Sequence, residues 1–169
     1  MSNNRRINAF TVIELMVAMA IAGVLLGMAL PAFNGFMEQR TMTTRVNDLV
    51  LAVNYARSEA AKLGGLVSVQ AMDASDSDNE WGPGYCVTIG NPGNCDNPLR
   101  LFTGMDDMTL DAQGAFNDET ALTFNARGLL TLDAAGTFIL CSTDATVNPG
   151  RTIALNRIGR TTSTTLVCP

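Results

Sequence analysis

The sequence predicts an α+β fold in which one long N-terminal helix precedes a domain of antiparallel β-sheet. Residues 10–64 have the composition of one extended helix, which is apolar in its first half and amphipathic in its second half. Residues 65–169 contain many short strand-like runs separated by turn residues. With 169 residues, the chain suits one globular domain beyond the helix.

The first half of the helix, residues 10–37, carries a single charged residue, Glu14. This run is long enough to cross a bilayer core of about 30 Å, which takes roughly 20 helical residues. Arg5 and Arg6 precede it with no acid among residues 1–9, and this asymmetry predicts a cytoplasmic N-terminus. A secretory signal peptide would be shorter and would end at a small-x-small cleavage site. We therefore expect residues 10–37 to form a membrane-spanning helix.

An ordinary signal anchor is the alternative interpretation of this helix, but it gives no reason for Glu14. A carboxylate inside an apolar helix costs several kcal/mol unless it finds a partner, so such residues are functional by default. The carboxylate therefore needs a partner of opposite charge.

The run Phe10-Thr-Val-Ile-Glu14-Leu15 behind a short basic leader resembles the N-terminal signature of type IV pilins and type II secretion pseudopilins. The resemblance implies that a prepilin peptidase removes the leader, residues 1–9, by cutting between Ala9 and Phe10. It also implies that the new N-terminus at Phe10 is methylated and that Glu14 serves assembly. The family nearly always has Gly before the cut, and here the small residue Ala9 stands there.

The second half of the helix, residues 38–64, is amphipathic and should bury one face against the sheet. Its apolar stripe recurs at steps of three and four residues, at Val46, Leu49, Val50, Val53, Ala56 and Ala60. Gly64 and Gly65 should end the helix. The segment Tyr55-Ala-Arg-Ser-Glu-Ala60 resembles a segment of the FimT/FimU/GspH branch of minor pilins and pseudopilins.

Beyond the helix, residues 65–169 should form the periplasmic or extracellular β-rich domain. The predicted strands are residues 66–72, 99–102, 122–124, 128–132, 137–142, 152–156 and 162–167, and residues 81–89 are predicted to be a turn followed by a strand. Two elements resemble features of the same branch: Trp81-Gly-Pro-Gly-Tyr85 at the start of one strand, and Phe124-Asn-Ala-Arg-Gly128 at a turn.

Four cysteines, Cys86, Cys95, Cys141 and Cys168, lie in the β-rich part of the chain. An even number of cysteines outside the membrane predicts disulfides in an oxidising compartment, and three pairings are open. We favour Cys86 with Cys95 and Cys141 with Cys168, because these pairs close a loop and fasten the C-terminus. A zinc site would need all four cysteines, whose spacing does not match C-x-x-C pairs.

Neither an enzyme nor a metal or cofactor site is predicted. The sequence has no His, which excludes His-based triads and metal sites, and it has no Gly-rich phosphate loop. Acids crowd one short segment, at Asp73, Asp76, Asp78 and Glu80. Calcium could bind such oxygen ligands, but Trp81 stands where an EF-hand loop needs Gly, so a solvated loop is the favoured interpretation.

The net charge of −5 gives the chain no global attraction for nucleic acid, although the charge is uneven. After Asp144 there is no acid, while Arg151, Arg157 and Arg160 remain, and these could line one face of a hairpin. Some FimT-type minor pilins capture DNA through a C-terminal G-R-x-R element. Gly159-Arg160-Thr-Thr162 resembles that element except that Thr162 replaces the second Arg.

The resemblance implies a minor type IV pilin that enters a pilus or primes its assembly through the N-terminal helix. Its expected partners are other major and minor pilins, the prepilin peptidase, the inner-membrane assembly machinery and the inner membrane. The chain would span the inner membrane once before assembly and then lie in the pilus, in the periplasm or at the cell surface. The alternatives are DNA uptake, with DNA as a partner, and a GspH-like pseudopilin of type II secretion.

Overall fold

A computed structural model describes residues 11–72, 79–117, 119–144 and 147–168, and between residues 29 and 34 it describes the backbone only. The chain divides into two compact units, residues 1–38 and residues 39–169. One helix, α1, spans Val12–Leu63. Eight strands follow: β1 (Val67–Ala71), β2 (Gly84–Ile89), β3 (Arg100–Thr103), β4 (Met108–Gly114), β5 (Ala121–Phe124), β6 (Gly136–Ser142), β7 (Gly150–Leu155) and β8 (Thr161–Leu166).

Both ends of α1 are set by local sequence. At its start the hydroxyl of Thr11 accepts a hydrogen bond from the backbone N–H of Glu14 (3.3 Å), as an N-cap residue does. At its end Gly64 takes a left-handed conformation (φ +65°), and the N–H of Gly65 bonds to the carbonyl of Ala60 (3.2 Å). Left-handed glycine caps end helices because they have no Cβ to clash with the backbone.

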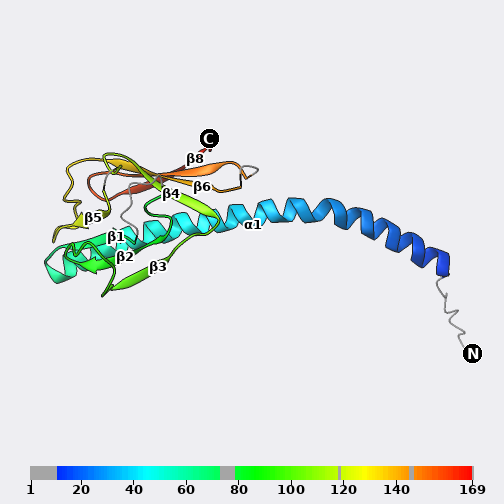
Figure 1. Ribbon diagram of the computed structural model, residues 1–169, viewed down its shortest axis with the longest axis horizontal. Helices are drawn as coiled ribbons and strands as arrows, with labels where there is room; N and C mark the ends of the chain where they lie inside the picture. The colour runs from blue at the N-terminus through cyan, green and yellow to red at the C-terminus, as the bar shows by residue number, and fades with distance from the viewer. Residues whose placement is uncertain (1–10, 73–78, 118, 145–146, 169) are drawn as a thin grey trace, which may run out of the picture. The chain divides into compact units, whose positions relative to one another are not determined.

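In the second unit the strands gather along α1 (Figure 1). The predicted apolar stripe of the helix is buried there, with Val50 partly buried. Leu49 and Val53 are 1% exposed, and Ala56 and Ala60 are fully buried. The amphipathic period of residues 38–64 therefore matches the face that the sheets cover.

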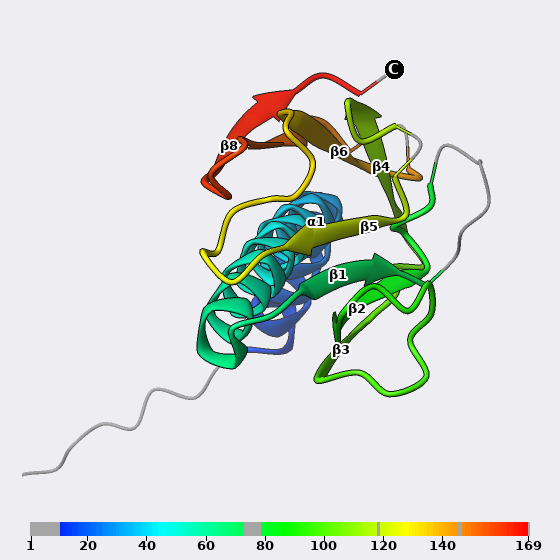
Figure 2. The ribbon, with the colours of Figure 1, turned by 90° about the vertical axis from the view of Figure 1, so that its left-hand side faces the viewer.

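Two four-stranded antiparallel sheets surround this helix face (Figure 2). One has the order β3-β2-β1-β5 and the other the order β4-β6-β7-β8. Their inner faces share one apolar core with the helix. Trp81 packs its ring edge-on against Phe138 of β6, with centroids 5.0 Å apart, and lies 6.2 Å from the ring of Tyr85 in β2. It thus joins side chains of both sheets.

The structure corrects three sequence predictions. Met108–Gly114 forms β4, for which no strand was predicted although Met108, Leu110 and Ala112 alternate with polar residues. Residues 128–132, a predicted strand, make only an isolated bridge between Phe124 and Leu130. Glu80, predicted to lie in a solvated loop, is only 8% exposed, whereas Asp73, Asp76 and Asp78 lie outside the described residues.

Within the part of the chain whose side chains are described, no helix combines the length and the apolar character needed to cross a membrane. The predicted membrane segment, residues 10–37, includes Phe10 and residues 29–34, which lie outside that part.

Candidate functional site

The start of α1 presents an apolar surface that this chain does not cover. Every residue from Val12 to Met28 is exposed. The large apolar side chains among them are Val12, Ile13, Leu15, Met16, Val17, Met19, Ile21, Val24, Leu25, Leu26 and Met28. A helix that is apolar on all sides belongs in an apolar surrounding, either lipid or other protein. This segment is therefore a candidate assembly surface.

Glu14 is the one acid of this surface, and it lies in the first turn of α1. Its position, three residues after the capping hydroxyl of Thr11, is the position that the capping-box motif gives to Glu. A carboxylate in the first turn also interacts favourably with the helix dipole. Glu14 thus suits the helix start locally while it brings a negative charge into an apolar surface. Ala9 and Phe10 lie outside the described residues.

The cysteines form two disulfides in the local pairing that the sequence favoured. Cys86 in β2 is joined to Cys95 in the β2–β3 loop. Cys141 at the end of β6 is joined to Cys168 near the C-terminus. A Cβ on Gly150 would clash with the sulfur of Cys168 and lie 2.6 Å from the carbonyl oxygen of Leu140, so the second disulfide packs against β7 only because a glycine stands there. Both bridges are structural, and no cysteine of the chain is free.

The C-terminal hairpin, β7 and β8, carries the three arginines predicted as a cationic face. Its turn is closed by a bond from the N–H of Asn156 to the carbonyl of Arg160 (3.1 Å) and by one from the N–H of Arg160 to Oδ1 of Asn156 (2.8 Å). Arg157 and Arg160 lie in this turn and are exposed. The guanidinium of Arg157 forms an exposed ion pair with Asp133 (2.8 Å).

Arg151 does not join the other two arginines. It lies at the opposite end of β7, where its register partners are Leu140 in β6 and Thr165 in β8. It is half-buried, and its Nη1 donates to the carbonyl of the adjacent Gly150 (3.3 Å). Since side chains alternate between the faces of a strand, Arg151 also shares the face of the buried Ile153 and Leu155. The hairpin therefore carries two exposed arginines at its turn and one half-buried arginine at its far end.

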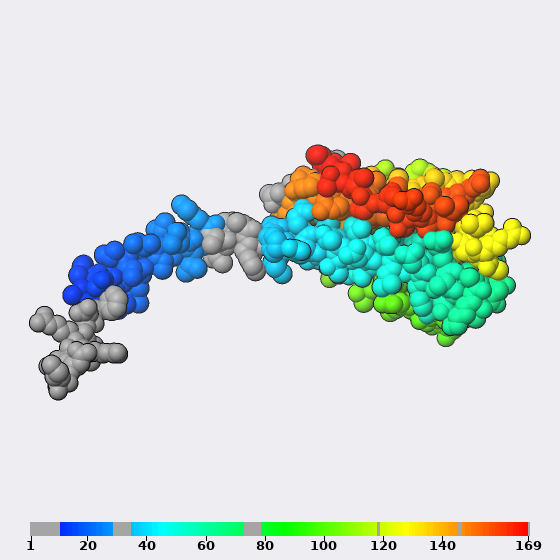
Figure 3. Space-filling view, turned by 180° about the vertical axis from the view of Figure 1, so that it is seen from behind, coloured from blue at the N-terminus to red at the C-terminus, as the bar shows by residue number. Residues whose placement is uncertain are grey.

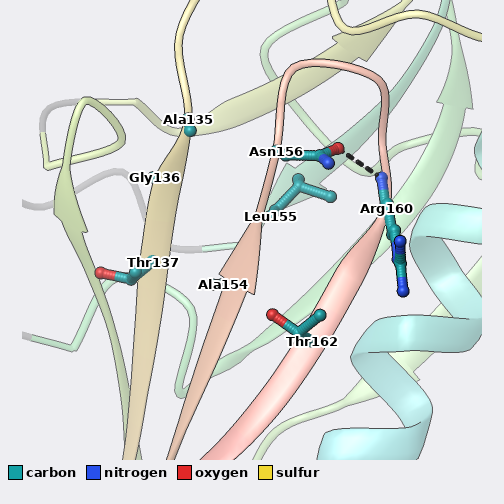
Figure 4. Close-up of a pocket in the computed structure, with 8 residues that line it drawn as sticks. All are labelled: Ala135, Gly136, Thr137, Ala154, Leu155, Asn156, Arg160 and Thr162. Atoms are coloured by element: carbon teal, nitrogen blue, oxygen red, sulfur yellow. Dashed lines mark hydrogen bonds between the residues drawn. The ribbon is translucent and has the colours of Figure 1, made fainter.

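An open pocket of about 200 Å³ lies at the turn end of this hairpin (Figure 4). Its walls come from three neighbouring strands and the segments that border them: Ala135, Gly136, Thr137, Ala154, Leu155, Asn156, Arg160 and Thr162. Among the described residues, none pairs with the guanidinium of Arg160. The guanidinium of Arg160 extends along the side of the hairpin in Figure 4, and an unpaired guanidinium can bind an anion such as a phosphate or a carboxylate.

Arg57, on the helix, holds this end of the hairpin in place. Its Nε donates to the carbonyl of Gly128 (3.0 Å), and its Nη1 donates to the carbonyl of Gly159 in the hairpin turn (3.1 Å). Both glycines have positive φ, of 70° and 76°. In the sequence, Arg57 stands out only as part of the segment Tyr55–Ala60, and no local pattern gives it a role. Its partners are 71 and 102 residues away in the chain, a distance at which no local pattern predicts contacts.

The family model of the type II transport protein GspH matches residues 45–159, and the prokaryotic N-terminal methylation motif matches residues 4–30. Among curated proteins there is no match.

Among solved structures, the chain is similar to the type IV minor pilin FimU of Pseudomonas aeruginosa in two crystal forms. Sequence identity is 27% in both, with TM-scores of 0.57 and 0.59. The matches cover 72% and 79% of this chain and 91% and 92% of FimU. The minor pseudopilin EpsH of the Vibrio cholerae type 2 secretion system has a TM-score of 0.52 at 13% identity. That match covers 73% of this chain and 95% of EpsH, and at such identity it shows the fold alone.

Proposed function

Because this chain belongs to the GspH family of minor pilins and pseudopilins, we propose that it is a minor type IV pilin that enters a pilus, or primes its assembly, through α1. The observation that carries the proposal is the apolar surface from Val12 to Met28, which is exposed in the single chain. Its partners are other major and minor pilins. Packed helices of neighbouring subunits would remove this surface from water, and the hydrophobic effect favours that burial.

Before assembly, the same helix holds the chain in the inner membrane, where the prepilin peptidase and the assembly machinery act on it. The peptidase cuts between Ala9 and Phe10, and Phe10 is then methylated; the match to the N-terminal methylation motif supports this step. Mass spectrometry of the protein purified from its host tests it. A mass that corresponds to residues 10–169 plus one methyl group is expected, and an intact N-terminus would contradict it.

Glu14 provides the specific contact of assembly. When α1 is buried among other helices, its carboxylate needs a positive partner, because an unpaired buried charge is strongly unfavourable. The α-amino group of a processed Phe10 on a neighbouring subunit is such a partner. A pair between Glu14 and the Phe10 of a neighbouring subunit exists only in the filament, so it favours the assembled state over the membrane-bound monomer.

The test measures incorporation rather than expression. Full-length wild type, Glu14→Ala and Glu14→Gln are produced in cells that carry the assembly machinery, and each is quantified in the membrane fraction and in sheared filaments. Both variants should remain in the membrane and be depleted from filaments. Asp106→Ala, which removes an exposed carboxylate of the β-rich domain, should be recovered like wild type. Equal recovery of Glu14→Ala and wild type in filaments would refute the role of Glu14.

A pseudopilin of a type II secretion system is the alternative within the same family. The 27% identity to a type IV minor pilin favours the pilus, because the similarity to EpsH is one of fold alone. Deletion of the gene distinguishes a role in the pilus from a role in the secretion system. Loss of pili with normal protein secretion supports the pilus, whereas a secretion defect with normal pili supports the secretion system.

Capture of DNA is a second candidate function, and the exposed Arg160 supports it. Its guanidinium has no partner among the described residues, and it borders an open pocket at the hairpin turn. Guanidinium groups bind phosphates of the DNA backbone without reading sequence. With a net charge of −5 on the chain, such binding would be weak and sensitive to salt.

A further inference from the structure

Arg127 is an exposed arginine in the turn after β5, far in sequence from the C-terminal hairpin. The turn is closed by a bond from the N–H of Gly128 to the carbonyl of Asn125 (2.7 Å). Oδ1 of Asn125 also accepts the N–H of Arg127 (2.9 Å) and the N–H of Leu129 (3.3 Å). The turn is therefore well ordered around Arg127, while its guanidinium has no partner among the residues that the structure describes.

Long-range hydrogen bonds hold this turn against the turn of the hairpin. The N–H of Leu130 donates to the carbonyl of Arg157 (3.3 Å), which links the two turns directly. Arg57 donates to the carbonyl of one glycine in each turn, Gly128 and Gly159. In Figure 3 the segment around Arg127 (yellow) lies at the end of the β-rich domain beside the orange-red hairpin and the last turns of α1.

This arrangement concentrates positive charge on an acidic chain. Arg57 uses its donors on neutral carbonyl groups, so no carboxylate offsets its charge there. Arg157 is offset by Asp133, whose side chain is 82% exposed, whereas Arg127 and Arg160 have no described counter-ion. Two exposed, unpaired guanidinium groups on adjoining turns are a favourable arrangement for a ligand with repeated negative charges.

We propose that Arg127 and Arg160 together bind the phosphodiester backbone of nucleic acid, with Arg157 beside them and Arg57 as the residue that positions both turns. This inference rests on the second candidate function and changes its site. The sequence predicted that Arg151 would line the cationic face together with Arg157 and Arg160. Arg151 lies at the other end of β7, and Arg127 stands beside the hairpin turn instead. The hydrogen bonds of Leu130 and Arg57 hold the two arginines on neighbouring turns.

The inference predicts a specific pattern among single arginine substitutions. Arg127→Ala and Arg160→Ala should each weaken binding several-fold. Each should also reduce the slope of log Kd against log salt by about 1, because each removes one phosphate contact. Arg151→Ala is the matched control, since it removes the same charge from a half-buried position at the far end of the hairpin and should bind like wild type.

The experiment uses the full-length protein in detergent micelles and fluorescence anisotropy of a labelled DNA duplex, from low to physiological salt. Circular dichroism melting curves check that each variant is folded, which is expected because Arg127 and Arg160 are exposed. Poly-glutamate serves as a competitor of equal charge without phosphodiester groups.

The outcomes separate this inference from the function on which it rests. No binding by wild type at low salt would refute DNA capture altogether. Binding that falls with Arg160→Ala but not with Arg127→Ala would keep DNA capture and overturn the role of Arg127. An equal loss in Arg151→Ala would show that binding follows net charge and would overturn the two-turn surface. Competition by poly-glutamate as strong as by unlabelled DNA would identify an acidic protein surface as the ligand instead.

Discussion

Arg57 in α1 donates a hydrogen bond from Nη1 to the backbone carbonyl of Gly159, 102 residues further along the chain (3.1 Å). The same guanidinium donates from Nε to the carbonyl of Gly128. One side chain thus connects the helix to two turns that belong to different parts of the β-rich domain. Both hydrogen bonds are partly buried, so water could replace them only in part if the guanidinium were removed.

Arg57→Ala should lower the free energy of unfolding by about 2–4 kcal/mol, because two partly buried carbonyls lose a charged donor. Urea denaturation followed by circular dichroism measures this. The control is Arg45→Ala on the same helix, which breaks a half-exposed pair with Asp48 (3.8 Å) and should cost less than about 1 kcal/mol. Equal destabilisation by both substitutions would contradict the anchoring role of Arg57.

Gly159→Ala should destabilise the domain more than a glycine substitution in an open turn. A Cβ on Gly159 would lie 2.6 Å from Cδ and Nε of Arg57, and its φ of +76° is unfavourable for residues other than glycine. Gly93→Ala is the matched control, because Gly93 has a φ of +75° with no atom within 4 Å of the added Cβ.

Backbone strain alone should cost about 1–2 kcal/mol in Gly93→Ala. Gly159→Ala adds the displacement of Arg57 to this cost, so its melting temperature should be the lower of the two. If both substitutions lower the free energy of unfolding equally, the close packing of Gly159 against Arg57 does not contribute to stability.

The Cys141–Cys168 disulfide should stabilise the domain more than Cys86–Cys95. Its cysteines are 27 residues apart, against 9 for the other pair, and a longer loop loses more entropy in the unfolded chain. The loop-entropy relation gives a difference of roughly 1 kcal/mol. Unfolding of the two double Cys→Ala variants tests this order. The reverse order would mean that packing around Cys86, which is fully buried, outweighs loop entropy.

Tyr85 should make the domain sensitive to alkaline pH. Burial raises the pKa of its hydroxyl well above the ordinary value of 10.0, Asp48 adds to this effect, and Arg45 opposes it. The folded state therefore favours the neutral hydroxyl. Below pH 10 the hydroxyl is neutral in the folded and in the unfolded chain, so the free energy of unfolding has its full value there. As pH rises above 10, the unfolded chain ionises first, so the free energy of unfolding falls.

Substitution of Tyr85 by Phe removes this ionisable group while it keeps the ring in the core. Tyr85→Phe should flatten the decline of stability above pH 10, as measured by urea unfolding at a series of pH values. The stacking of the ring on Phe102, with centroids 5.1 Å apart, should persist. An unchanged decline in Tyr85→Phe would assign the alkaline sensitivity to other groups.

Much of the fold could be predicted from the sequence because its signals are local. The amphipathic period that includes Leu49 and Val53 marks the buried face of α1, and Gly64 marks its end. The fold class and most strands follow from runs of alternating residues between turn residues. β4 was missed although Met108 and Leu110 fit that alternation, and the division into two sheets was not predicted, because pairing between distant strands leaves no local trace.

The candidate sites divide in the same way. By itself, the sequence determined the apolar segment with Glu14, because charge and hydrophobicity are properties of consecutive residues. Which arginines lie near one another was decided only by the tertiary structure. Arg151 is near Arg157 in sequence but lies at the other end of an extended strand, in which each residue adds about 3.3 Å. Arg127 is 30 residues before Arg157, yet the bonds of Leu130 and Arg57 bring its turn beside the hairpin. Strand direction and long-range hydrogen bonds, rather than distance along the chain, therefore decide which charges act together.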